Sequence, residues 1–162
     1  MERGRLNLFK AAVEAQLEEI SEIFERIEER RKQRGIIATE SLAYQLHNLY
    51  CAFEDLFKIV ADLFENTVED SGKYHLELLY RMKLSVDGIR PALLSEQSFQ
   101  LLNRLRAFRH FFRHACSYEL DPRKVELVLE DALELKALYR RDVERFLREV
   151  ESALGQPEER AD

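Results

Sequence analysis

The chain has 162 residues, the length of one ordinary domain, and 46% of them are hydrophobic, which is enough to bury a core. Its formal net charge of −6 argues against nucleic-acid binding over the whole surface and against a polybasic membrane anchor. Any anionic ligand would therefore have to meet a local basic patch. Only five glycines and three prolines interrupt a sequence dominated by Leu, Glu, Arg and Ala, which favours an all-α fold.

Nothing in the sequence indicates membrane insertion or secretion. No apolar run approaches the roughly 20 residues that a membrane-spanning helix needs. The N-terminal segment MERGRLNLFK has no apolar signal-peptide region. Two cysteines, Cys51 and Cys116, are too few for a disulfide framework. We therefore expect a reduced, cytoplasmic protein that does not bind membranes.

Apolar residues recur at helical spacing along most of the chain and predict its first three helices. The first is expected to end at about residue 34, because Gly35 follows. The second has Thr39 as a candidate N-cap and is expected to end at Ser71-Gly72. A shorter helix follows at about residues 74–82. Residues 85–97, which contain glycine and proline, are then predicted to form a loop.

Two further helices begin at residues that are typical helix caps. Ser95 is the candidate N-cap of the fourth helix, and Asp121 followed by Pro122 predicts the first turn of the fifth. The apolar pattern of the fifth continues without a break to about residue 150. We therefore predict an antiparallel bundle of four to five helices over residues 1–154, followed by a flexible polar tail at 155–162. The predicted buried residues of the fourth helix are Leu101, Leu105, Phe108, Phe112 and Ala115.

The fourth helix carries the most unusual stretch, RLRAFRHFFRHACSYELD at residues 104–121, in which four arginines and two histidines precede the first carboxylate. Residues three or four apart share a helix face, so Arg106, Arg109 and Arg113 form one stripe, and His110 and His114 lie on another. A guanidinium matches phosphate geometry, and an imidazole transfers protons near neutral pH. Together they suit metal-free phosphodiester cleavage, in which the imidazole moves a proton and the guanidinium neutralises charge on phosphorus.

Helix geometry limits this interpretation. Arg109 and His114 are five residues apart, which is about 140° around an ideal helix, so they do not converge on one phosphate from a single straight helix. Convergence requires the helix to end near His114, or two chains of a twofold dimer to contribute to one site.

Simpler structural roles remain open for the same residues. Arginines beside an apolar face are often a solvated helix edge whose stems pack on the core. His110 and His114 have the spacing of a metal-binding pair, but no carboxylate on the helix accompanies them, so we expect no metal site. A single cysteine such as Cys51 is most often a small core residue.

The stretch FRHFFRHAC, in which Arg109 is followed after four residues by His114, resembles the Arg-x4-His-x-Tyr signature of the HEPN superfamily and is similar to the HepT-like ribonuclease toxins of prokaryotic toxin–antitoxin pairs. The segment YQLHNLYCAFEDLFKIVADLFE is similar to the family's second helix, and IRPALLSEQSFQLLNRLRAFRHFFRHACSYELD to its loop and active-site helix. The resemblance implies a dimeric helical bundle with a cleft shared by both subunits. It also implies metal-independent cleavage of RNA, not DNA, without a cofactor, and a minimal nucleotidyltransferase antitoxin as partner.

The resemblance also implies roles for individual residues. By match to the motif, Arg109 would hold the scissile phosphate and His114 would act as the acid or base. Arg106, His110 and Arg113 are not motif positions, and we expect them to contact phosphate only because of their place on the helix.

The chain departs from the family motif at one position. Where the motif has the tyrosine that the antitoxin modifies with AMP, this sequence has Cys116. A thiol is shorter than a phenol and is a poor equivalent as a stable AMP acceptor. Tyr118 has a phenol but stands outside the motif, so it is a less suitable substitute.

Three functional hypotheses follow. The first is a toxin-like endoribonuclease that acts as a homodimer and is restrained by a nucleotidyltransferase. The second, supported by Cys116, is a non-catalytic helical module that keeps the scaffold and binds such a partner. The third is a nucleotide-binding accessory subunit, which would have to hold its ligand by side chains because the sequence has no glycine-rich phosphate loop.

Overall fold

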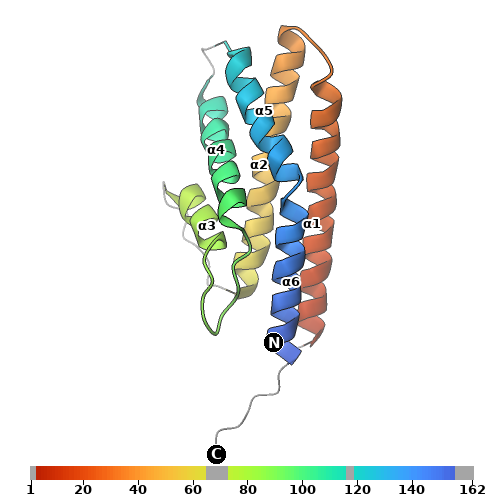
Figure 1. The fold of residues 1–162 in the computed structure, drawn as a ribbon, viewed down its shortest axis with the longest axis vertical. Coiled ribbons are helices and arrows are strands. Elements are labelled where there is room, and N and C mark those ends of the chain that lie inside the picture. Colours follow the sequence, from red (N-terminus) through yellow and green to blue (C-terminus); the bar gives the residue numbers. More distant parts are fainter. Residues whose placement is uncertain (1–2, 65–72, 116–118, 156–162) are drawn as a thin grey trace, which may run out of the picture.

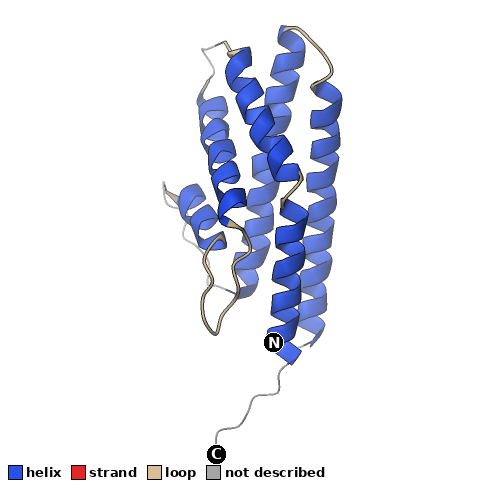
Figure 2. Ribbon diagram, in the orientation of Figure 1, coloured by secondary structure: helices blue, strands red, loops and turns tan. Residues whose placement is uncertain are grey.

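All the helices and loops discussed below come from a computed structural model that describes residues 3–64, 73–115 and 119–155 (Figure 1). Within these ranges the regular structure is helical, with one isolated bridge between Val86 and Arg90 (Figure 2). This confirms the predicted all-α class. The helices are α1 (Arg3–Arg30), α2 (Ile36–Phe64), α3 (Tyr74–Met82), α4 (Glu96–His114), α5 (Pro122–Lys136) and α6 (Tyr139–Gly155).

The helices form an elongated bundle in which α2 is central. It runs antiparallel to α1 and to α4, and it packs against α1, α3, α4 and α5 (Figure 1). Helices α5 and α6 follow one another along the bundle, beside α2 and α1, while the short α3 packs against α2 and α4. None of the helices in the described ranges is long and apolar enough to cross a membrane.

The predicted apolar stripes meet in one core. Tyr139 at the start of α6 joins three helices, because its ring stacks on Phe24 of α1 at 5.4 Å and meets Phe53 of α2 edge-on at 5.5 Å between ring centroids. Such aromatic pairs add specific geometry to a large buried apolar area. Of the residues predicted to be buried on the fourth helix, Leu101, Leu105 and Phe108 are buried, whereas Phe112 and Ala115 are only partly so. The core also contains buried apolar residues of the other long helices, among them Val13, Ile20, Phe24, Ile27, Leu42, Leu46, Leu49, Phe53, Leu56, Val60, Val125, Ala132, Leu135, Tyr139, Phe146 and Val150.

The predicted boundary between the first two helices needs one correction. Gly35 lies between them with φ of +98°, a conformation that favours glycine. Helix α1 ends at Arg30, and α2 begins at Ile36, so Thr39 is inside the helix and is not its N-cap. Its hydroxyl donates to the carbonyl of Gly35 at 3.2 Å, the bond to the preceding turn that threonine can form within a helix. The predicted end at residues 71–72 lies outside the described residues.

The caps predicted for α4 and α5 are confirmed. Ser95 Oγ accepts from the amide of Ser98 at 3.2 Å, and Asp121 Oδ1 accepts from the amide of Arg123 at 3.0 Å. Pro122 occupies the first turn of α5. The short helix predicted at about residues 74–82 also matches α3.

The prediction of a single fifth helix was wrong, because this part of the chain forms two helices, α5 and α6. The amides of Ala137 and Leu138 bond to carbonyls three residues back, those of Glu134 and Leu135, which tightens the chain between α5 and α6. Neither glycine nor proline occupies this break, and the apolar pattern continues through it. No local signal therefore marked the break in the sequence.

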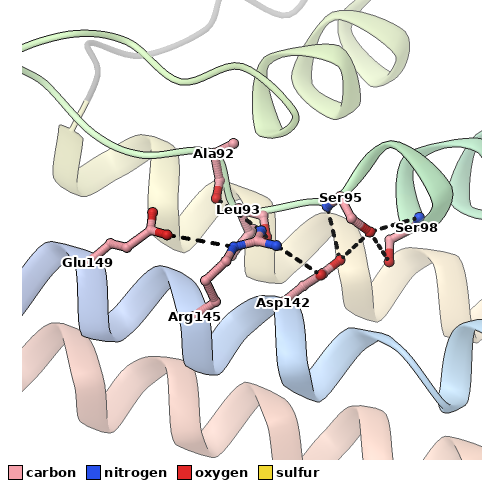
Figure 3. A network of polar contacts seen from close by, with 7 residues as sticks. All are labelled: Ala92, Leu93, Ser95, Ser98, Asp142, Arg145 and Glu149. Atoms are coloured by element: carbon pink, nitrogen blue, oxygen red, sulfur yellow. Dashed lines mark hydrogen bonds and ion pairs between the residues drawn. The ribbon is translucent and has the colours of Figure 1, made fainter.

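A buried polar network fixes α6 against the start of α4 (Figure 3). Asp142, only 1% exposed, accepts from the amide of Ser95 at 3.0 Å and from its hydroxyl at 2.9 Å. Arg145, one turn further on, donates to Asp142 at 3.3 Å and to the carbonyl of Leu93 at 3.2 Å. The network holds the N-terminus of the helix that carries the arginines and histidines.

Candidate functional site

The five predicted site residues spread across α4 from its buried edge to its exposed side. Arg106 and Arg109 are half-buried, whereas Arg113, His110 and His114 are exposed. We call Arg106, Arg109 and Arg113 the arginine stripe. As predicted, it runs beside the apolar face of α4, and it extends from the core boundary to solvent.

A row of polar residues on α2 faces this part of α4. His47, Tyr50, Cys51 and Glu54 recur at intervals of three and four residues along α2, so they share one face. We call them the α2 polar stripe. The His47 ring lies 5.3 Å from that of Phe112, centroid to centroid, near the end of α4. The candidate site is therefore formed between two helices that are distant in sequence.

Arg109 makes the direct link between the two stripes. Its Nε donates to Cys51 Sγ at 3.4 Å, across 58 positions of sequence. Within the described residues its guanidinium has no other hydrogen bond or ion pair, so both terminal amino groups remain available. Arg106 similarly donates through Nε, to Asn103 Oδ1 at 3.0 Å. A planar guanidinium held by Nε still presents a two-pronged edge, the geometry that suits phosphate.

Within the described residues, the arginines of the stripe differ from Arg104 in their partners. Arg104 on the same helix pairs with Asp131 of α5 at 2.9 Å, as expected for an ordinary helix edge. In the described parts of the chain, Arg106, Arg109 and Arg113 form no ion pair with a carboxylate. The molecule is acidic overall, so three unpaired guanidinium groups on one face make a local positive site in which an anion is favoured.

His47 lies beside this charge as a neutral ring. Burial lowers its pKa below the usual 6.5, and the positive charges of Arg109 and Arg113 lower it further. Its Nε2 is 3.7 Å from Cys51 Sγ. Its Nδ1 is buried and has no hydrogen-bond partner among the described residues. A neutral imidazole has one donor and one acceptor nitrogen, so the ring can serve as a proton acceptor at neutral pH.

Tyr50 and Glu54 form the inner end of the α2 polar stripe. Tyr50 is fully buried, and its hydroxyl has no hydrogen-bond partner in the part of the chain that the structure describes. Burial, followed by the nearby Glu54 carboxylate, raises the pKa of this phenol, which therefore stays neutral. Glu54 is buried and lies 2.6 Å from His75 Nδ1 of α3 and 3.7 Å from Lys58 Nζ. The carboxylate is thus bonded to α3 and to its own helix, and its negative charge also acts through space on Arg109.

The two histidines of α4 lie at its exposed end. The rings of His110 and His114 contact one another with centroids 4.7 Å apart. Helix α4 ends at His114, because Ala115 leaves helical geometry at φ −87° and ψ 32°. One condition for convergence with Arg109 is thus met. However, the side chains of Arg109 and His114, both within the described residues, share no hydrogen bond or ring contact.

The sequence analysis missed most of the α2 polar stripe. It interpreted Cys51 as a small core residue, but this side chain is only partly buried and contacts both Arg109 and His47. The available signal was polar residues at helical spacing in an apolar helix. Among the described residues, no three or more His, Cys, Asp or Glu side chains are grouped to hold a metal. Cys116 and Tyr118 lie outside the described residues.

The lowered pKa of His47 predicts a pH dependence of stability. Just below its usual pKa of 6.5 the unfolded chain takes up a proton that the folded protein does not. The stability that the neutral His47 ring contributes to the folded protein is therefore fully present above pH 6.5. It is lost as the pH falls through the pKa of the folded state. We expect the stability difference between the parent and His47→Gln to shrink between about pH 7.5 and about pH 5.5 in urea denaturation. A constant difference would contradict this, and His110→Gln, which alters an exposed ring, is the control.

Comparison with known proteins places the site in a family. A sequence profile described as HepT-like protein matches residues 41–150. The matched segment includes the α2 polar stripe and all of α4, with Arg109 and His114. No curated protein and no solved structure gave a significant match. Because the profile covers more than half of the chain and confirms the resemblance seen in the motif, this protein belongs to the HepT-like protein family.

Proposed function

We propose that this HepT-like protein is a metal-independent endoribonuclease of toxin type, active as a homodimer and restrained by a nucleotidyltransferase partner. The observation that carries the proposal is the arginine stripe next to His114 at the end of α4, whose three guanidinium groups form no ion pair with any carboxylate of the described residues. Family membership supports the same activity and the same kind of partner.

The proposed reaction uses the ribose 2′-hydroxyl as nucleophile. Arg109 would hold the scissile phosphate, while Arg106 and Arg113 contact the flanking backbone and neutralise charge. His114 would take the 2′-hydroxyl proton or give one to the 5′-oxygen that leaves. The products would be a 2′,3′-cyclic phosphate and a free 5′-hydroxyl. His110, which contacts the His114 ring, would assist in phosphate binding.

The homodimer is proposed because Arg109 and His114 of one chain do not contact one another. Arg109 contacts α2, whereas His114 stands at the exposed end of α4. A twofold axis near this end would bring Arg109 of one subunit toward His114 of the other. It would also supply two imidazoles, one to accept the proton and one to donate.

The test is cleavage of end-labelled tRNA and mRNA by purified protein in EDTA. We expect fragments with cyclic-phosphate ends from the parent protein. Arg109→Ala should lose about 100-fold or more in rate, as for removal of a group that stabilises developing charge. Arg104→Ala is the matched control, because it removes an arginine of the same helix that is already paired with Asp131.

The alternative is a non-catalytic module that binds a nucleotidyltransferase, and Cys116 at the motif's tyrosine position favours it. Under this hypothesis neither the parent nor Cys116→Tyr cleaves RNA, while a complex with the partner still forms. If Cys116→Tyr cleaves RNA and the parent protein does not, the cysteine is the reason that the parent lacks nuclease activity.

A further inference from the structure

We propose that Cys51 and His47 are positioning residues for Arg109: the thiol sulfur anchors the guanidinium through its Nε–H, and His47 orients the thiol. The inference rests on the proposed function in one respect, that Arg109 is the residue that holds a phosphate. It assigns a role to two side chains of α2 that lie outside the Arg109–His114 motif.

The first step is the direction of the Arg109 side chain. An arginine binds a phosphate with both terminal amino groups only when its guanidinium plane is fixed in one orientation. Because the side chain has many rotamers, another group must fix that orientation. Cys51 Sγ lies 3.4 Å from Arg109 Nε and accepts its N–H. This contact leaves both terminal amino groups of the guanidinium for phosphate. A carboxylate in the same place would compete with phosphate for the guanidinium. A thiol fixes the orientation without supplying a full counter-charge.

The second step is the orientation of the thiol. His47 Nε2 is 3.7 Å from Cys51 Sγ on the side of α2 nearer the end of α4. Because burial and the two neighbouring arginines keep the ring neutral, Nε2 can accept the S–H proton. The sulfur lone pairs are then left for the Nε–H of Arg109. The Phe112 ring, 5.3 Å away, holds the imidazole in place.

A purely structural role for Cys51 makes a different prediction. A small core residue could be replaced by alanine with no effect on Arg109. Cys51 is only partly buried, whereas the next residue, Ala52, is 6% exposed and already fills the core side of this turn. The thiol therefore lies where the core meets the arginine stripe, and its contacts there are polar.

The decisive experiment follows the Arg109 Nε–H by NMR in 15N-labelled protein, with its signal assigned by its loss in Arg109→Lys. A hydrogen bond to a charged donor slows exchange with water, and we expect exchange about tenfold slower than for exposed arginines such as Arg148. Cys51→Ala should remove this protection, while Cys51→Ser, which keeps an acceptor, should retain most of it. Asn48→Ala is the matched control, because it removes a partly buried polar side chain of the same helix that lies outside the α2 polar stripe.

Each outcome decides the inference. Rapid exchange of the Arg109 Nε–H in the parent protein, or unchanged protection in Cys51→Ala, would overturn it. His47→Phe keeps an aromatic ring against Phe112 but has no acceptor, so it should reduce the protection in part.

RNA cleavage provides an independent second measurement. We expect Cys51→Ala to lower kcat/KM about tenfold and Cys51→Ser to restore most of the activity. If the parent protein cleaves no RNA, the proposed function fails, yet the exchange measurement still decides whether Cys51 holds Arg109. The two failures are therefore distinguishable.

Discussion

Replacing His114 with alanine should reduce RNA cleavage by about 100-fold or more while leaving the bundle folded. General acid–base groups contribute on the order of 10²–10⁴-fold to rate, and His114 is the motif imidazole. Its side chain is exposed on the last residue of α4, so its removal should change the free energy of unfolding by no more than about 0.5 kcal/mol. A large loss of activity without a loss of stability is therefore the expected combination.

The measurement pairs single-turnover cleavage in EDTA with urea denaturation of the same preparations. His110→Ala is the matched control, because it removes a neighbouring exposed imidazole of the same helix that lies outside the motif. We expect a clearly smaller loss of rate from it. Undiminished cleavage by the His114 variant would rule out this residue as the acid or base.

The largest effect on stability is expected from Asp142→Ala, at about 2–4 kcal/mol. The carboxylate is buried and accepts from both the amide and the hydroxyl of Ser95 (Figure 3). Alanine would leave the Ser95 amide without its acceptor at the N-terminus of α4, while the Ser95 hydroxyl, as a donor, would keep only its 3.1 Å bond to Ser98 Oγ. Arg145 is partly exposed, so solvent screens its ion pair with Asp142, and losing this pair contributes less to the loss of stability.

Urea denaturation would measure this effect, with two variants that separate its causes. Asp142→Asn keeps one oxygen acceptor for Ser95 and should cost less than the alanine variant. Glu149→Ala removes only a 4.0 Å pair between partly exposed side chains and should cost less than about 0.5 kcal/mol. If Asp142→Ala costs as little as Glu149→Ala, the network does not hold α6 to α4.

The sequence by itself determined the all-α class, the bounds of α3 and the starts of α4 and α5. Apolar periodicity, the caps Ser95 and Asp121, and the turn at Gly35 are local properties that act within a few residues. The arginine stripe could be predicted for the same reason, since it requires only the spacing of one helix. So could the likeness of the motif to HepT-like proteins.

Only the tertiary structure decided which of these charges form a site. The sequence does not show which arginine of α4 is ion-paired, but packing places Arg104 against Asp131 and Arg109 against Cys51. It also divided the predicted last helix in two, at a break without glycine or proline. The partners of Arg104 and Arg109 depend on contacts between helices, and such contacts leave no periodic signal in either helix alone.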